Sequence, residues 1–269
     1  MMETTERPGL VSLLSRISDG AIVRFVFYAM LAGALSVLYI DFRELMAENA
    51  NAFVDPDLPV LPAFDPEGPL GNPGPAVTTD PELLRQPLSI ALTNGGILKL
   101  VGTIVPGAAD RFKAEIDARG EYIKTVTLNS PGGVVEEAIR IGELLRARGY
   151  DTLVEGGAIC ASSCPLVFAS GVGRTAAPSA AIGVHQMYAA VSANEKPLDA
   201  LRSAGEAMSD AQSMTAVISR HLAAMGVDPA AWLNALDTPP NRLYYFSREE
   251  LERYRLVTPV PTLIPAGGA

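Results

Sequence analysis

The chain has 269 residues, of which 48% are hydrophobic, so it is long enough for one large domain or two small ones with a substantial core. Its formal net charge is −9 at pH 7, and it holds only four lysines: Lys99, Lys113, Lys124 and Lys196. A chain this acidic offers no basic stripe to neutralise phosphates, which argues against nucleic acid as a partner.

A membrane-spanning helix is the first element expected in chain order, over residues 21–40 (AIVRFVFYAMLAGALSVLYI). About 20 apolar residues at helical rise match the hydrocarbon thickness of a bilayer, and Arg24 lies close enough to one end to snorkel. Arg7, Arg16 and Arg24 lie at or before the N-terminal edge, whereas only Arg43 lies just beyond the other edge. The positive-inside rule therefore predicts a cytoplasmic N-terminus over residues 1–20, with the rest of the chain outside.

A cleaved signal peptide is the competing interpretation, supported by the small residues Ala50-Asn51-Ala52. The apolar run is long for a signal peptide, and charged residues intervene before that site, so an uncleaved anchor is favoured. A buried helix of a soluble domain fits less well, because residues 41–87 follow as a proline-rich linker. Nine of the chain's 21 prolines lie within residues 51–87, which predicts an extended, semi-stiff tether.

From residue 88 onwards, predicted strands and helices alternate, which is typical of a parallel α/β core. The expected strands are residues 89–92, 97–104, 122–128, 152–154 and 182–185, and the expected helices are 108–119, 134–148 and 165–169. Beyond His185 the pattern becomes helical, over residues 198–225 and 229–236. Ser247 and Glu250 form a predicted capping box, and residues 258–269 form a proline- and glycine-rich tail.

The stretch over residues 156–186 carries the candidate chemistry (GGAICASSCPLVFASGVGRTAAPSAAIGVHQ). Pro165 is tolerated in the first turn of a helix, so Ser162 and Ser163 should lie at a helix N-terminus. His185 ends a short apolar strand. A hydroxyl beside backbone N–H groups and a nearby histidine are the parts of a serine nucleophile and its general base. Serine caps are also common without any catalytic role.

Three ordered motifs resemble the proteolytic subunit of the Clp protease (ClpP) and its relatives in the ClpP/crotonase superfamily. They are LNSPGG at residues 128–133, ASS at 161–163 followed by an apolar helix to Gly171, and PSAAIGVHQ at 178–186. A weaker fourth piece joins ALDT at 235–238 to FSREE at 246–250. The resemblance covers residues 88–257 and implies a repeated β-β-α core with a C-terminal helical part.

The resemblance also implies roles for individual residues. Ser162 would be the nucleophile, His185 its general base, and Asp237 the acid that orients the imidazole. The backbone N–H groups of Gly132 and Ser163 would form the oxyanion hole. Gly133 and Val134 would pair with an extended substrate strand.

Several alternatives to these roles stay open. Ser163 competes with Ser162 as nucleophile, because relatives usually carry a bulky residue or glycine after the nucleophile. The rivals of Asp237 are Asp199, Asp210 and Asp228. A serine–lysine dyad, as in the signal peptide peptidase A relatives, would need Lys196, which lies in a polar loop that is a poor place to lower a lysine pKa. His221 is expected on an ordinary helix surface.

Cys160 and Cys164 flank the two serines and are the only cysteines of the chain. In an oxidising compartment they are a possible disulfide that would stiffen the nucleophile turn; two small buried residues are the alternative. Two cysteines without further ligands do not make a metal site.

The resemblance therefore implies a serine endopeptidase that hydrolyses peptides or unfolded proteins without a cofactor. It would be a single-pass protein of the inner (cytoplasmic) membrane, with its protease domain in the periplasm or another extracytoplasmic space, and it would form homo-oligomers. The alternatives are an inactive scaffold that binds without turnover and a crotonase-type acyl-CoA enzyme, which would need CoA.

Overall fold

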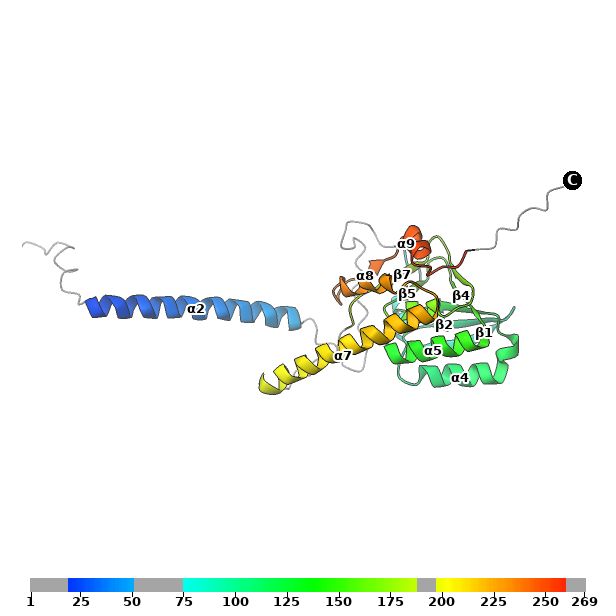
Figure 1. Ribbon diagram of the computed structural model, residues 1–269, viewed down its shortest axis with the longest axis horizontal. Coiled ribbons are helices and arrows are strands. Elements are labelled where there is room, and N and C mark those ends of the chain that lie inside the picture. Colours follow the sequence, from blue (N-terminus) through cyan, green and yellow to red (C-terminus); the bar gives the residue numbers. More distant parts are fainter. Residues whose placement is uncertain (1–18, 51–74, 188–196, 260–269) are drawn as a thin grey trace, which may run out of the picture. The chain divides into compact units, whose positions relative to one another are not determined.

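The computed structural model describes residues 19–50, 75–187 and 197–259 (Figure 1). The predicted N-terminal segment before residue 19, linker residues 51–74, Lys196 and tail residues 260–269 lie outside the described part. The chain divides into two compact units, Met1–Asp55 and Pro56–Ala269.

One apolar helix, α2 (Asp19–Ala50), is the described part of the first unit. Its segment Gly20–Arg43 has a mean hydropathy of 2.0 and is long and apolar enough to cross a membrane, as judged by length and composition alone. The helix includes the whole of the predicted span over residues 21–40. It continues to Ala50 because most residues after 40, such as Glu44, Leu45 and Met46, are good helix formers.

A five-stranded mixed sheet is the main scaffold of the second unit, with the strand order β1-β2-β3-β4-β6. Its strands are β1 (Ser89–Thr93), β2 (Ile97–Val101), β3 (Thr125–Asn129), β4 (Asp151–Val154) and β6 (Arg174–Ala176). Only β1 is antiparallel to its neighbour. The carboxyl ends of four parallel strands therefore meet at one edge, where α/β proteins usually bind ligands.

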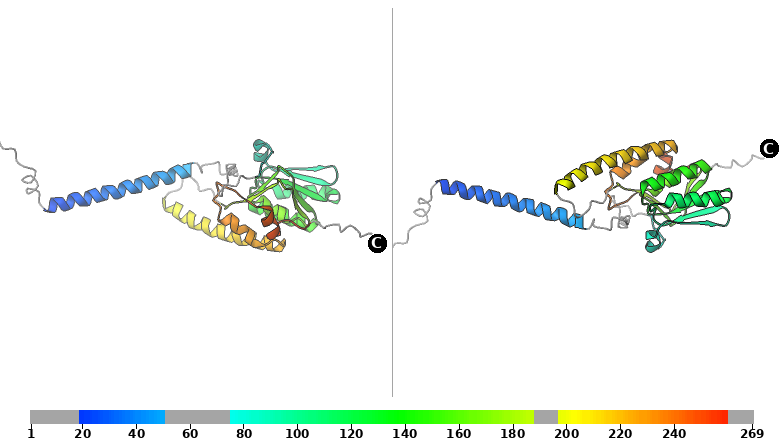
Figure 2. Two further views of the ribbon diagram at one scale, coloured as in Figure 1. Left: turned by 90° about the horizontal axis from the view of Figure 1, so that it is seen from above. Right: turned by 90° about the horizontal axis from the view of Figure 1, so that it is seen from below.

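Two amphipathic helices, α4 (Ala108–Arg119) and α5 (Val135–Arg148), lie side by side along this sheet (Figures 1 and 2). Their apolar side chains face the core: Phe112 and Ile116 of α4, and Ile141 and Leu145 of α5, are buried. Gly149 ends α5 at φ 71, in the left-handed conformation that glycine adopts readily. Both helices were predicted from apolar spacing and a terminal glycine, and both predictions are confirmed.

A second sheet of three short strands was only partly predicted. It consists of β5 (Ile159–Ala161), β7 (Ala181–Val184) and β8 (Tyr244–Tyr245), with β5 and β7 parallel and β8 antiparallel to β7. Short helix α3 (Pro81–Arg85) contributes Leu84 to the small apolar cluster against β5 and β7. Ser130 joins the two sheets, since its N–H donates to Ile159 O and its carbonyl accepts from Ala161 N.

The C-terminal part is mainly helical, with α7 (Pro197–Ala224), η2 (Pro229–Trp232), α8 (Leu233–Leu236) and α9 (Arg248–Arg253). The residues of α7 between 205 and 213 are mostly exposed, whereas Ile218 and Leu222 near its other end are buried. The predicted capping box of α9 is confirmed: Ser247 Oγ accepts from Glu250 N, and the Glu250 carboxylate accepts from Ser247 N.

Arg174 is a buried cation whose hydrogen-bond acceptors are backbone carbonyls. Its guanidinium donates to Leu256 O, Gly171 O, Arg255 O and Met225 O, at distances of 2.9, 3.0, 2.8 and 3.4 Å. These carbonyls follow the C-terminal ends of α6, α7 and α9, where carbonyls lack helical partners. Burial lowers the pKa of Arg174 to about 10. One side chain therefore ties three helix ends together.

Replacing Arg174 with Met is expected to lower the free energy of unfolding by about 3–5 kcal/mol, because it removes a donor from four carbonyls, two of them in buried hydrogen bonds. Urea unfolding of the full chain in detergent measures this loss. Arg242→Met is the matched control: Arg242 is exposed, and its side chain has no hydrogen-bond partner among the described residues, so a change within about 0.5 kcal/mol is expected. Equal effects of the two variants would contradict this role of Arg174.

Candidate active site

Ser162 and His185 lie at the carboxyl ends of two adjacent strands. Strands β5 and β7 are parallel, with Ala161 opposite Gly183, and Ser162 N donates to Gly183 O at 3.0 Å. Ser162 follows the last residue of β5, and His185 follows the last residue of β7. The fold therefore brings together the two residues that sequence reasoning paired. Among hydrogen bonds between described residues, none joins Ser162 Oγ to His185; such contacts often close only when substrate binds.

The backbone of Ser162 adopts a left-handed conformation, with φ 59, which is uncommon for a residue other than glycine. It turns the chain sharply between β5 and helix α6 (Cys164–Ala169). A disulfide between Cys160 and Cys164, with Cα atoms 5.1 Å apart, spans this turn. The conformation of Ser162 is thus held from both sides, and backbone strain of this kind is concentrated at functional sites.

The two serines differ in accessibility. Ser162 is half-buried, whereas Ser163 is only 1% exposed and its hydroxyl oxygen is buried without a hydrogen-bond partner. A substrate can approach Ser162, which is partly exposed, without rearrangement of the turn. It reaches the buried hydroxyl of Ser163 only if the turn opens. This difference favours Ser162 over Ser163 as the reacting group.

Gly132 lies directly against the serine turn. A Cβ built on Gly132 would lie 2.6 Å from Ser162 Cβ and 2.8 Å from Ser163 N, so only glycine fits at this point, where φ is 96. The Gly132 N–H donates to Ser130 Oγ at 3.1 Å. Ser163 N–H has no acceptor among the described residues. Of the two predicted oxyanion-hole donors, Ser163 N–H is therefore open among the described residues, whereas Gly132 N–H already has an internal acceptor.

Gly133 and Val134, the predicted substrate-pairing residues, lie beside Ile104. Ile104 N donates to Gly132 O and Val134 N donates to Ile104 O, both at 2.8 Å. The Gly133 N–H has no acceptor in the described part of the chain. The side of this segment that faces Ile104 is thus paired internally, and Gly133 N–H is the group that remains open for another acceptor.

The imidazole of His185 is buried, with 5% of the residue exposed. Its Nδ1 lies 2.7 Å from the backbone oxygen of Gln186. A carbonyl only accepts hydrogen bonds, so Nδ1 carries the proton and Nε2 keeps its lone pair. Burial lowers the pKa of His185, and the hydrogen bond to the Gln186 carbonyl works in the opposite direction. A neutral imidazole with a free Nε2 is the form that a general base requires.

Asp237, the predicted acid, is exposed and follows the last residue of α8. No hydrogen bond or ion pair between described residues joins it to His185. Its neighbours in the chain contact the histidine segment instead: Thr238 O accepts from Gln186 N at 2.8 Å, and Leu236 O accepts from Gln186 Nε2 at 2.6 Å. The residues on either side of Asp237 are therefore hydrogen-bonded to Gln186, next to His185, but in the described part of the chain no hydrogen bond or ion pair joins the Asp237 carboxylate to the His185 imidazole.

The rivals of Asp237 have other positions. Asp228 caps η2, where its carboxylate accepts from Ala230 N. Asp210 is an exposed residue of α7, and Asp199 lies near the start of the same helix. No hydrogen bond between described residues joins Asp228 or Asp210 to His185.

The expectation that His221 lies on a helix surface is wrong, because the residue is only 6% exposed. Its Nε2 lies 3.1 Å from both Ser170 Oγ and Leu166 O. Ser170 Oγ donates to Leu166 O at 2.9 Å, and Ser170 is fully buried. The carbonyl acceptor requires the proton on His221 Nε2, so this second serine–histidine pair has no free Nε2 lone pair and is structural. Gly142 of α5 gives it room, since a Cβ there would lie 2.3 Å from Ser170 Oγ.

Stability is expected to fall as pH drops below about 6.5, because burial lowers the pKa of both histidines of the chain. Below the pKa of histidine in the unfolded chain, the unfolded chain binds protons that the folded chain does not. Each histidine therefore lowers the free energy of unfolding by at most about 1.4 kcal/mol per pH unit. Urea unfolding between pH 6.5 and 5.5 measures the slope. His221→Gln, which keeps a donor for Leu166 O, should reduce the slope by about half; an unchanged slope would contradict the account.

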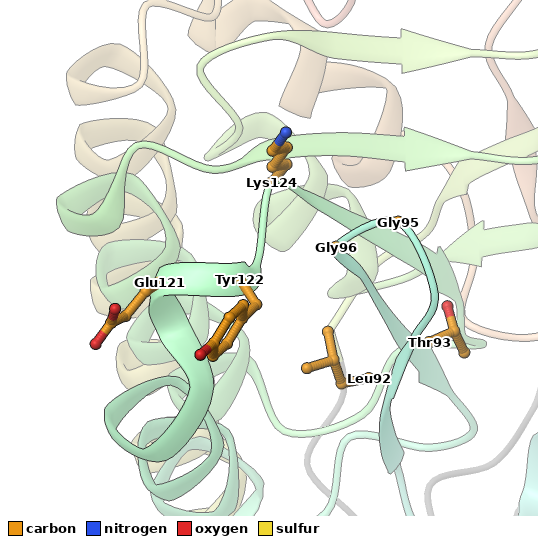
Figure 3. Close-up of a pocket in the computed structure, with 7 residues that line it drawn as sticks. All are labelled: Leu92, Thr93, Gly95, Gly96, Glu121, Tyr122 and Lys124. Atoms are coloured by element: carbon orange, nitrogen blue, oxygen red, sulfur yellow. The ribbon is translucent and has the colours of Figure 1, made fainter.

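An open pocket of about 440 Å³ lies elsewhere, at the start of β2 and β3 (Figure 3). Leu92 and Tyr122 line facing sides of it, beside the Gly95-Gly96 turn and Lys124. Neither Ser162 nor His185 lines this pocket, so it belongs to a different part of the unit. The described residues contain no group of three or more His, Cys, Asp or Glu side chains suited to a metal.

A comparison with models of protein families finds no family that matches this chain, and a comparison with curated protein sequences finds no significant match.

Proposed function

We propose that the chain is a membrane-anchored serine peptidase, similar in mechanism to the ClpP/crotonase superfamily that its motifs resemble. Ser162 Oγ attacks the substrate carbonyl and His185 Nε2 takes up the hydroxyl proton. The observation that carries the proposal is the juxtaposition, at the ends of adjacent strands, of Ser162, held at φ 59, and His185, whose Nδ1 lies 2.7 Å from Gln186 O. The turn around Gly132 packs against the serine, and the N–H groups of Gly133 and Ser163 have no acceptor among the described residues.

The nature of the open donors supports acyl transfer. Ser163 N–H and Gly133 N–H come from the two segments that meet beside Ser162, and neither has an acceptor among described residues. Backbone donors directed at a developing oxyanion supply the largest single contribution to this chemistry, about 10²–10³-fold per donor. Substrate recognition through backbone groups is tolerant of sequence, which suits peptides or unfolded protein as substrates.

The proposed location is the cytoplasmic membrane, with the peptidase unit on its extracytoplasmic side. The apolar segment Gly20–Arg43 and the arginine distribution around it support this orientation. The disulfide between Cys160 and Cys164 supports it independently, because such bonds persist in oxidising compartments. Homo-oligomerisation is proposed from the family resemblance.

An inactive scaffold is the second candidate, favoured by the missing contact between Ser162 and His185. An acyl-CoA enzyme is a third, since it would use the same oxyanion donors. It has no need of a histidine-activated serine, and CoA is a cytosolic cofactor.

These functions can be separated by incubating the full chain in detergent with a quenched fluorescent unfolded protein or with acetyl-CoA and measuring the products. The proposal predicts peptide products whose formation is lost in His185→Ala, with acetyl-CoA left intact. Binding without products would support the scaffold. Thioester hydrolysis without peptide products would support the acyl-CoA enzyme.

A further inference from the structure

We infer that the imidazole of His185 is oriented by the backbone carbonyl of Gln186, and that the Gln186 side chain is the positioning residue that fixes this carbonyl. The inference rests on the proposed function. It assigns a role to a residue that motif reasoning left without one, and it removes a carboxylate from the set of groups that the site needs.

Gln186 is clamped to the α8 segment at two points. Its backbone N–H donates to Thr238 O at 2.8 Å, and its side-chain amide donates to Leu236 O at 2.6 Å. Two donors from one residue to carbonyls two positions apart hold both the backbone N–H and the side chain of Gln186 against the end of α8. The carbonyl of the same residue then accepts from His185 Nδ1 at 2.7 Å. Loss of the side-chain amide would leave Gln186 with one anchor point, so that the residue and its carbonyl can shift relative to His185.

The clamp fixes the tautomer as well as the ring position. In serine peptidases the acid has these two tasks, together with stabilising the imidazolium that forms during reaction. A carbonyl dipole performs the first two and contributes less to the third. A site of this kind should therefore depend on Gln186 and be insensitive to the charge of Asp237, whose carboxylate is exposed.

The two histidines of the chain allow a direct test by ¹⁵N NMR of histidine-labelled full chain in detergent. We expect the Nδ1–H tautomer for His185 and the Nε2–H tautomer for His221, because each bears its proton toward a carbonyl. In Gln186→Met, a variant of similar size that cannot donate, His185 should become a mixture of tautomers. His221, whose hydrogen-bond partners among the described residues are Ser170 and Leu166, should keep its signal and so report that the fold is intact.

Gln186→Met and Asp237→Asn are also compared with wild type for the rate of labelling by a fluorophosphonate. Gln186→Met should be labelled about 10²-fold more slowly, as expected when a reacting group is misplaced by about 1 Å. Asp237→Asn should keep the wild-type rate within about twofold and the same His185 tautomer.

A loss of about 10⁴-fold in Asp237→Asn, with a changed tautomer, would overturn the inference and make Asp237 the orienting acid. An unchanged tautomer and rate in Gln186→Met would overturn it as well. The exposed position of Asp237 makes that variant informative even if Gln186→Met does not fold. If wild type is not labelled, the proposed function fails, and the NMR signals still decide whether Gln186 positions the ring.

Discussion

Ser162→Ala is expected to lower the rate of hydrolysis of an unfolded protein by at least about 10⁴-fold, as loss of a serine nucleophile does in other peptidases. Ser163→Ala should keep most of the activity, because the Ser163 hydroxyl is buried beyond the reach of a substrate. The second variant should also be more stable, by about 1 kcal/mol, since it removes a buried hydroxyl that has no partner. Product formation and urea unfolding, measured on the same preparations, give both quantities.

Ser162→Ala and Ser163→Ala together also test which of the two adjacent serines is the nucleophile. The sequence places two serines side by side, and only their different burial separates them. Activity that survives in Ser162→Ala and is lost in Ser163→Ala would mean that the turn opens when substrate binds. Equal losses in the two variants, with stability unchanged, would show that both hydroxyls are needed and would contradict the assignment of a single nucleophile.

Gly132→Ala is expected to reduce activity by at least about 10²-fold. The added Cβ would lie 2.6 Å from both Ala161 O and Ser162 Cβ, so the two segments that form the site must separate. Such a shift moves the donors away from the position of the oxyanion, and a single lost donor already costs about 10²–10³-fold. Steady-state hydrolysis measures the loss.

Gly149→Ala is the matched control for this variant. Gly149 also has a positive φ, of 71, but a Cβ there would meet no atom within 4 Å. Both substitutions carry the backbone cost of a left-handed residue, about 1–2 kcal/mol. Only Gly132→Ala disturbs the serine turn, so Gly149→Ala should lose stability and keep its activity. Similar activities of the two variants would show that contact between Gly132 and the serine turn is not needed for function.

The mixed α/β fold could be predicted largely from local signals. Periodic apolar residues and terminal glycines predicted α4 and α5, and apolar and β-branched runs predicted β1, β2, β3 and β4 of the larger sheet. Strands β5, β6 and β8 have three, three and two residues, too few for any periodicity to appear. They form because the long-range pairing of β5 with β7, and of β6 with β4, supplies hydrogen bonds that local sequence does not encode.

The candidate site could likewise be predicted in part from the sequence. The order of the motifs predicted that Ser162, His185 and Gly132 belong together, and parallel pairing brings their segments to one place. The burial of His221 was missed because its serine and carbonyl partners come from α6, more than 50 positions away in sequence. Gln186 was missed for the same reason: its clamp to Leu236 and Thr238 depends on how α8 packs beside β7.

The most direct test of the central claim is covalent labelling of the wild-type full chain with a fluorophosphonate, followed by mass analysis of the intact protein and of its fragments. An activated serine predicts one adduct per chain, mapped to Ser162, which does not form when His185 is replaced by Ala. No adduct on folded wild type, in either the oxidised or the reduced state of the Cys160–Cys164 bond, would contradict a serine peptidase and favour the binding scaffold.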